Sequence, residues 1–72
     1  MRMAETVQQM RQDQGLSQAQ LADRARITLE ALRNVEAGNT VRPRTIERTA
    51  RALGLTPMDL YERAAAPANA EN

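Results

Sequence analysis

Three glycines divide the chain into short segments in which apolar residues recur at helical spacing. Gly15, Gly38 and Gly54 each follow such a segment, where a residue with left-handed backbone commonly ends a helix. Valine and isoleucine total only five, phenylalanine and tryptophan are absent, and no long stretch alternates apolar with polar residues. Strand formation is therefore disfavoured, and the pattern predicts an all-α chain.

The apolar spacing and the capping residues predict five helices, over residues 3–14, 18–24, 29–37 and 44–53 and from residue 56 onward. Ser17 and Gln20 form a capping box, while Thr28 and Thr56 are suitable N-caps, with Pro57 in the first helical position. We expect the first four helices to bury Met3, Val7, Met10, Leu21, Ala22, Ala25, Leu32, Val35, Ile46, Thr49, Ala50 and Leu53. No large apolar residue follows position 63, so we expect a domain over residues 1–63 and a flexible tail over 64–72.

The 72 residues include no cysteine and no histidine, which excludes disulfides, thiolate metal sites and histidine-based nucleophile arrangements. Three methionines, Met3, Met10 and Met58, lie on apolar helix faces, where core packing is a better interpretation than a soft metal site. No apolar run approaches the roughly 20 residues that span a bilayer, and the N-terminus lacks the apolar core of a secretion signal. We expect a cytoplasmic, nucleoid-associated protein that is not an enzyme, with no cofactor, metal, membrane partner or evident small-molecule effector.

Positive charge is concentrated in the middle of the chain. Residues 24–51 carry seven arginines and three glutamates, net +4, whereas the flanking segments are net −1 and net −2. Such asymmetry is typical of a protein that binds a polyanion, although a solvated helix face would give the same count. All ten basic residues are arginines, whose planar guanidinium groups suit phosphate and guanine.

The segment 17–38 has the pattern of a helix-turn-helix, with two short helices, a tight link and apolar residues that face inward. Ala22 allows the two helices to cross closely, and Ile27 and Leu32 complete the buried side. By pattern alone this signal is moderate, because short helical pairs occur in many bundles.

Over about residues 5–61 the sequence resembles the phage-repressor and Cro family of helix-turn-helix domains, the xenobiotic-response-element type. The resemblance rests on Gly15-Leu16-Ser17-Gln18 with Leu21-Ala22, Glu36-Ala37-Gly38, Arg42-Pro43-Arg44, and Leu53-Gly54-Leu55 with Leu60. It implies a compact five-helix, lambda-repressor-like DNA-binding domain whose second and third helices form the helix-turn-helix. Arg26 departs from the family, which usually has glycine there, so we expect an unfavourable left-handed backbone that costs about 1 kcal/mol.

The resemblance also implies which residues contact double-stranded DNA. The outer face of the third helix would contact bases in the major groove through Thr28, Leu29, Glu30, Arg33 and Asn34. The starts of the second and fourth helices would contact the backbone or the minor groove through Ser17, Gln18, Arg42 and Arg44.

Several of these residues have alternative roles. Asn34 can pair with adenine, and Glu30 can either accept from cytosine or orient its helical neighbours. Arg48 and Arg51 are either further contacts or ordinary solvated residues. Arg11 and Glu36 match a partly buried ion pair between the first and third helices.

These inferences predict a sequence-specific transcriptional regulator, a repressor or controller protein, that binds a palindromic operator as a homodimer. Dimerisation is expected because a single recognition helix gives little specificity. The expected dimer surface comprises Leu55, Pro57, Met58, Leu60 and Tyr61, unless these residues complete the core instead. The alternatives are an antitoxin that represses its own promoter and a protein-interaction or coactivator module on the same fold.

Overall fold

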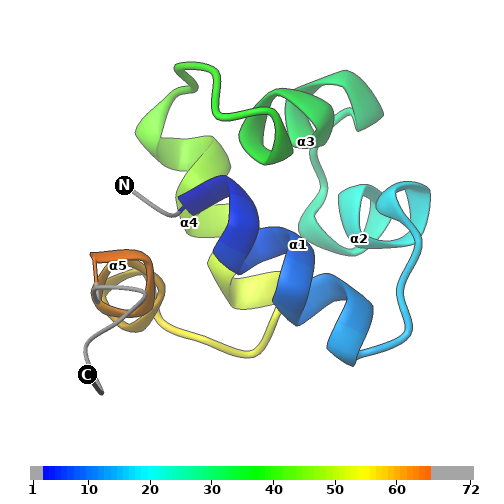
Figure 1. Cartoon of the computed structure of the whole chain (residues 1–72). Helices are drawn as coiled ribbons and strands as arrows, with labels where there is room; N and C mark the ends of the chain where they lie inside the picture. Colours follow the sequence, from blue (N-terminus) through cyan, green and yellow to red (C-terminus); the bar gives the residue numbers. More distant parts are fainter. Residues whose placement is uncertain (1–2, 66–72) are drawn as a thin grey trace.

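A computed structural model describes residues 3–65, which form five α-helices (Figure 1). The helices are α1 (Met3–Asp13), α2 (Gln18–Ala25), α3 (Leu29–Glu36), α4 (Pro43–Ala52) and α5 (Pro57–Ala65). No strand occurs in this part of the chain. The prediction of an all-α fold is therefore confirmed, and the ends expected for the first four helices lie within one residue of the observed ends.

Three helices, α2, α3 and α5, begin directly after the N-cap residues that the sequence indicates. The Ser17 Oγ accepts from the Gln20 N–H at 3.0 Å, and the Ser17 N–H donates to the Gln20 Oε1 at 2.8 Å. The Thr28 Oγ1 accepts from the Ala31 N–H, and the Thr56 Oγ1 accepts from the Asp59 N–H. Such caps matter here because helices of eight to eleven residues are too short to be stable alone.

One core joins all five helices. Figure 1 shows α1 between the α2–α3 pair and α5, while α4 crosses behind and contacts α2, α3 and α5. The buried cluster comprises Val7, Leu21, Ala22, Leu32, Val35, Ile46, Ala50, Leu53 and Leu60. Thr49 is also buried, and its hydroxyl donates to the Thr45 carbonyl oxygen at 2.8 Å. The faces predicted to be buried in α2, α3 and α4 are confirmed, while Met3 and Met10 of α1 are half-buried against the cluster.

The expectations for the C-terminal part need two corrections. Leu60 is fully buried, so it is a core residue and not part of a dimer surface. Ala64 is also fully buried and α5 continues to Ala65, so residues 64 and 65 are part of the folded helix and not of the expected tail. An alanine packs where two helices approach closely, and its small side chain gives no signal in the sequence. The rest of the predicted tail lies outside the described residues.

Within residues 3–65 no helix is both long enough and apolar enough to cross a membrane.

Candidate nucleic-acid interface

The turn between α2 and α3 depends on the backbone of Arg26. Its φ is 61° and its ψ is 43°, and it is the one residue other than glycine with a positive φ in the described chain. The left-handed conformation expected from the sequence is therefore confirmed. It lets the Ile27 N–H donate to the Ala22 carbonyl oxygen at 3.0 Å, so a link of only three residues, 26–28, joins α2 to α3.

A buried ion pair attaches α3 to α1. The Arg11 Nε donates to the Glu36 Oε2 at 2.7 Å, and the Arg11 Nη2 donates to the Glu36 Oε1 at 3.0 Å. Glu36 is only 7% exposed. A third donor of the same guanidinium, Nη1, bonds the Leu16 carbonyl oxygen at 2.9 Å. The ion pair expected between the first and third helices is confirmed, and its forked geometry fixes the position of α3.

Two glutamines complete this attachment. The Gln18 Nε2 at the start of α2 donates to the Glu36 Oε1 at 3.0 Å. The Gln8 Nε2 of α1 donates to the Glu36 carbonyl oxygen at 2.6 Å. Sequence reasoning missed Gln8, although its position three residues before Arg11 places both on one face of α1. The C-terminal end of α3 is therefore held by α1 and α2 together.

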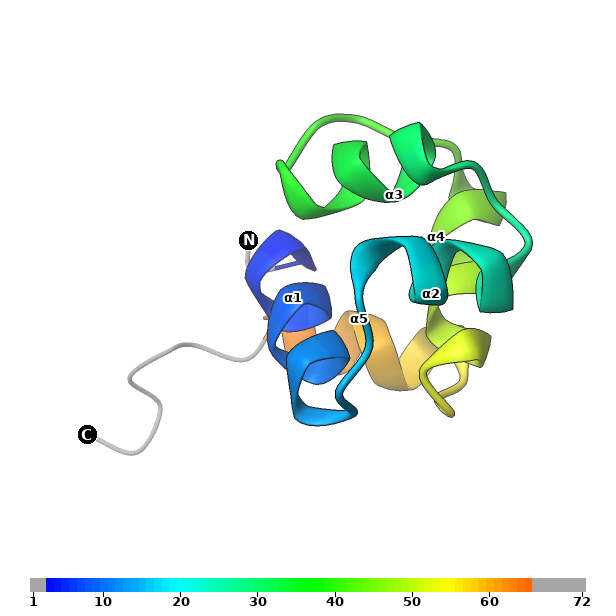
Figure 2. The ribbon, with the colours of Figure 1, turned by 90° about the vertical axis from the view of Figure 1, so that its right-hand side faces the viewer.

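The outer face of α3 is open to solvent. α3 lies at the upper edge of the molecule in Figures 1 and 2, with its buried side on the other helices. Glu30 and Arg33 are exposed, and Leu29 and Asn34 are half-buried. Positions 30, 33 and 34 lie on one face because residues three and four apart are neighbours on a helix. This face offers a carboxylate, a guanidinium and an amide at the molecular surface.

Asn34 also contacts the segment that follows α3. The Asn39 Nδ2 donates to the Asn34 Oδ1, and the Asn39 N–H donates to the Asn34 carbonyl oxygen, both at 3.0 Å. Sequence reasoning missed Asn39, whose only signal is its place after the helix-ending Gly38. One lone pair of the Asn34 amide oxygen is thus occupied, while its NH₂ group has no partner within residues 3–65.

The start of α2 provides donors for an anion. The capping box uses the N–H groups of Ser17 and Gln20. The N–H groups of Gln18 and Ala19 keep no partner in the described residues and lie at the positive end of the helix dipole. The Gln18 side chain is occupied in part by Glu36, so its phosphate contact stays a prediction.

Exposed arginines flank α3 at the start of α4. Arg42 is the N-cap of α4 without a side-chain capping bond, and Arg44 follows Pro43 in the first turn. Arg33, Arg42 and Arg44 are exposed, and none pairs with a carboxylate in the part of the chain that the structure describes. Free guanidinium groups of this kind can contact phosphates or base edges.

No group of three or more acidic side chains within residues 3–65 is placed to hold a metal ion.

Comparison with known proteins gives one match. A family model described as a helix-turn-helix domain matches residues 2–64, which include almost all of α1 to α5. No curated protein and no solved structure matches the chain.

Proposed function

We propose that this chain, which belongs to the helix-turn-helix domain family, is a sequence-specific repressor or controller protein of the phage-repressor and Cro type. A domain of this family indicates a DNA-binding regulator and is typically not an enzyme. The observation that carries the proposal is the outer face of α3. It exposes polar groups able to contact base edges, while the opposite side of the helix is tied to α1 and α2.

In the proposed complex, α3 enters the major groove, which is wide enough to admit a helix. Asn34 contacts adenine, Arg33 contacts guanine or a phosphate, and Glu30 accepts from cytosine or orients its neighbours. Leu29 and Thr28 lie at the start of the helix, where a methyl group can touch thymine. The attachment of Glu36 to two other helices keeps this face in one orientation.

The phosphate contacts of the proposal come from both sides of α3. The free N–H groups of Gln18 and Ala19 can bind one phosphate at the start of α2. Ser17 and the remaining amide donor of Gln18 lie beside them. Arg42 and Arg44 contact the backbone or the minor groove next to α3.

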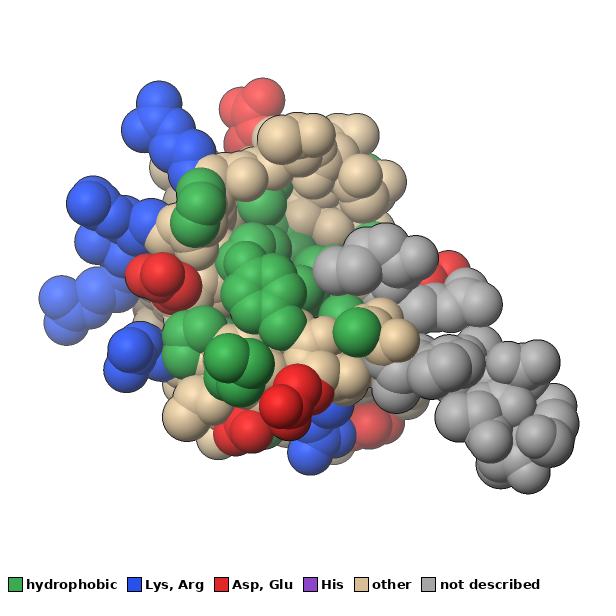
Figure 3. Space-filling view, turned by 90° about the vertical axis from the view of Figure 1, so that its left-hand side faces the viewer, with side chains coloured by type: hydrophobic (Ala, Val, Ile, Leu, Met, Phe, Trp, Pro, Cys, Tyr) green, Lys and Arg blue, Asp and Glu red, His purple; other side chains and the backbone are tan. Residues whose placement is uncertain are grey.

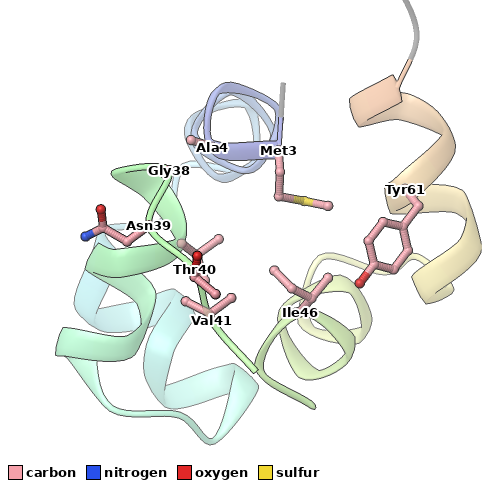
Figure 4. A pocket seen from close by; sticks show the side chains of 9 residues that line it. Met3, Ala4, Gly38, Asn39, Thr40, Val41, Ile46 and Tyr61 are labelled. Carbon is pink, nitrogen blue, oxygen red and sulfur yellow. The ribbon is translucent and has the colours of Figure 1, made fainter. Parts of the chain in front are cut away.

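The proposed regulator is a homodimer on a palindromic operator. Met58 and Tyr61, the large hydrophobic residues exposed in the described chain, are 65% and 42% exposed. Figure 3 shows hydrophobic side chains gathered on this face. Beside them lies a cleft of about 340 Å³, where Met3, Ile46 and Tyr61 face one another (Figure 4). Exposed apolar side chains and an apolar cleft lie on the same face, so two copies of the chain could bury these surfaces against each other.

Leu55 and Pro57 are half-buried, and the proposed dimer surface includes them. The two alternative functions, antitoxin and protein-interaction module, gain no specific support from the described residues. The antitoxin alternative depends on the tail, most of which lies outside them.

The test compares Asn34→Ala with Asn39→Ala on DNA from upstream of the gene and on random DNA, by gel shift. Asn34→Ala should weaken operator binding by about 1–3 kcal/mol, which is roughly 5- to 150-fold in affinity, with almost no effect on random DNA. Asn39→Ala removes the side-chain bond to the Asn34 Oδ1 but keeps the Asn34 amide, so it should have little effect on either DNA.

Three outcomes would contradict parts of the proposal. An equal loss of operator affinity in the two variants would show that Asn34 acts through its bond to Asn39 and not through a DNA base. Equal loss on both DNAs would assign Asn34 to the backbone. A wild-type protein that does not prefer its upstream DNA would overturn sequence-specific regulation and favour the interaction module.

A further inference from the structure

Four arginines that the proposed base-reading surface does not use line one shallow hollow between α2 and α4. We call it the arginine hollow; it measures about 330 Å³ and is lined by Arg24, Ala25, Arg26, Arg48, Arg51 and Ala52. In Figure 2 the C-terminal end of α2 lies beside α4, below α3. The positive middle of the sequence therefore folds into two surfaces, one beside α3 and one at the hollow.

A row of arginines on α4 connects the two surfaces. Arg44, Arg48 and Arg51 are spaced by four and three residues, so they share one face of the helix. At 1.5 Å per residue, the row extends about 10 Å along α4. Figure 3 shows basic side chains aligned along one edge of the molecule. The hollow thus continues the surface that begins at the start of α4.

The charges in the hollow are not neutralised by the protein. None of its arginines pairs with a carboxylate within the described residues, although Asp23 and Glu47 are exposed on the same helices. A side-chain hydrogen bond from the Arg48 Nη1 to the Arg26 carbonyl oxygen, at 3.1 Å, holds Arg48 across the hollow. Clustered like charges repel one another, and a bound anion would remove this repulsion.

The lining of the hollow indicates which anion it binds. A protein partner would need large apolar anchors, and the hollow has only two alanines. A small ligand would need a site that encloses most of its surface, whereas this hollow is shallow. A chain of phosphates needs neither, because it is bound by charge and runs past an open surface.

We propose that the arginine hollow binds the phosphate backbone of DNA outside the segment read by α3, as a continuation of the row that begins at Arg44. This inference rests on the proposed DNA binding. It extends the DNA-binding surface along α4, beyond the helix-turn-helix. The contacts add affinity for any sequence and no preference among sequences.

The double variant Arg24→Ala/Arg51→Ala tests the inference and leaves the bond between Arg48 and Arg26 in place. Binding to a random-sequence duplex is measured by fluorescence anisotropy over a range of salt concentrations. The slope of log affinity against log salt should become shallower by about two units, one for each phosphate that the variant no longer neutralises. Arg63→Ala, an exposed arginine on α5, is the control and should leave the slope unchanged. Arg24→Lys/Arg51→Lys should restore most of the slope, because the charge is kept.

An unchanged slope in the double variant, with a circular dichroism spectrum like that of the wild type, would overturn the inference and leave the regulator intact. A reduced slope in a protein that does not prefer its upstream DNA would support the hollow and overturn the specific regulator. A wild-type protein that binds neither DNA would overturn both. An equal change of the salt slope in the Arg63→Ala control would also count against the hollow. It would show that the slope responds to the loss of any arginine, wherever it lies.

Discussion

Glu36 is the residue through which side chains of α1 and α2 hold α3. Its carboxylate accepts from Arg11 and Gln18, and its carbonyl oxygen accepts from Gln8. Desolvation offsets much of the attraction in a buried ion pair, yet removal of one partner leaves an unpaired buried charge, which costs about 3–5 kcal/mol. We therefore infer that Glu36 and its partners mainly fix the position of α3. Their net contribution to the stability of the domain is smaller than the number of hydrogen bonds suggests.

Arg26 holds an unfavourable backbone conformation that glycine would adopt more easily. Left-handed backbone costs a residue with a Cβ atom about 1–2 kcal/mol. The arginine places a guanidinium beside the arginine hollow, which glycine could not do. Backbone strain of this kind is typical of functional positions.

Replacement of Arg26 by glycine should therefore stabilise the domain. We expect Arg26→Gly to raise the free energy of unfolding by about 1 kcal/mol, measured by urea denaturation. Arg26→Ala is the matched control, because it removes the charge but keeps the Cβ atom, and it should give a clearly smaller gain. If the two variants gain equally, the strain is negligible and the effect comes from relief of charge repulsion.

The helices as elements depend on their caps and on one another. α2 and α3 have eight residues each, fewer than the roughly 12–15 at which an isolated helix becomes even marginally stable. Each begins with a side-chain cap, and the bonds to Glu36 hold the end of α3. The stability of α3 thus depends on its surroundings more than on its own helix propensity.

Thr28 has two roles at the start of α3, one observed and one proposed. Its Oγ1 accepts from the Ala31 N–H, so Thr28→Ala should lower the free energy of unfolding by about 1 kcal/mol. Thr28→Ser keeps the hydroxyl and should retain most of the stability. Thr40→Ala, at an exposed position with no hydrogen bond recorded in the structure, is the control for chemical denaturation. Equal stabilities of the Thr28→Ala and Thr40→Ala variants would show that the cap contributes little.

At the scale of the whole molecule, the specificity of the proposed regulator depends on the proposed homodimer. Met58 and Tyr61 offer a smaller patch than most obligate interfaces, so we expect a dimer of micromolar or weaker affinity in solution. An operator with two half-sites would raise the effective concentration of the second copy and make binding cooperative. Such binding gives a threshold in protein concentration, which suits a switch.

Met58→Asp should abolish dimerisation and cooperative operator binding while the helical fold persists, because the side chain is mostly exposed. Leu60→Ala should instead lower the stability by about 2–5 kcal/mol, because Leu60 is in the core. Sedimentation and circular dichroism distinguish the two effects. A Met58→Asp protein that still dimerises would place the interface elsewhere, and one that unfolds would make Met58 part of the folded core.

The sequence alone determined the features that depend on residues close together in the chain. The starts of α2, α3 and α5 follow from the N-caps at Ser17, Thr28 and Thr56, because a capping bond joins residues within one turn. The left-handed Arg26 and the pairing of Arg11 with Glu36 were expected from the likeness to a family, whose turn and ion pair this chain retains.

Only the tertiary structure decided which side of α5 is buried and how the arginines divide. Apolar residues form one broad face of α5, so spacing could not distinguish its buried part, Leu60 and Ala64, from exposed Met58. The distribution of the arginines over two surfaces follows from how α2 and α4 pack, which no local pattern encodes. The bonds of Gln8 and Gln18 to Glu36 likewise join residues far apart in the chain, so their formation depends on helix packing.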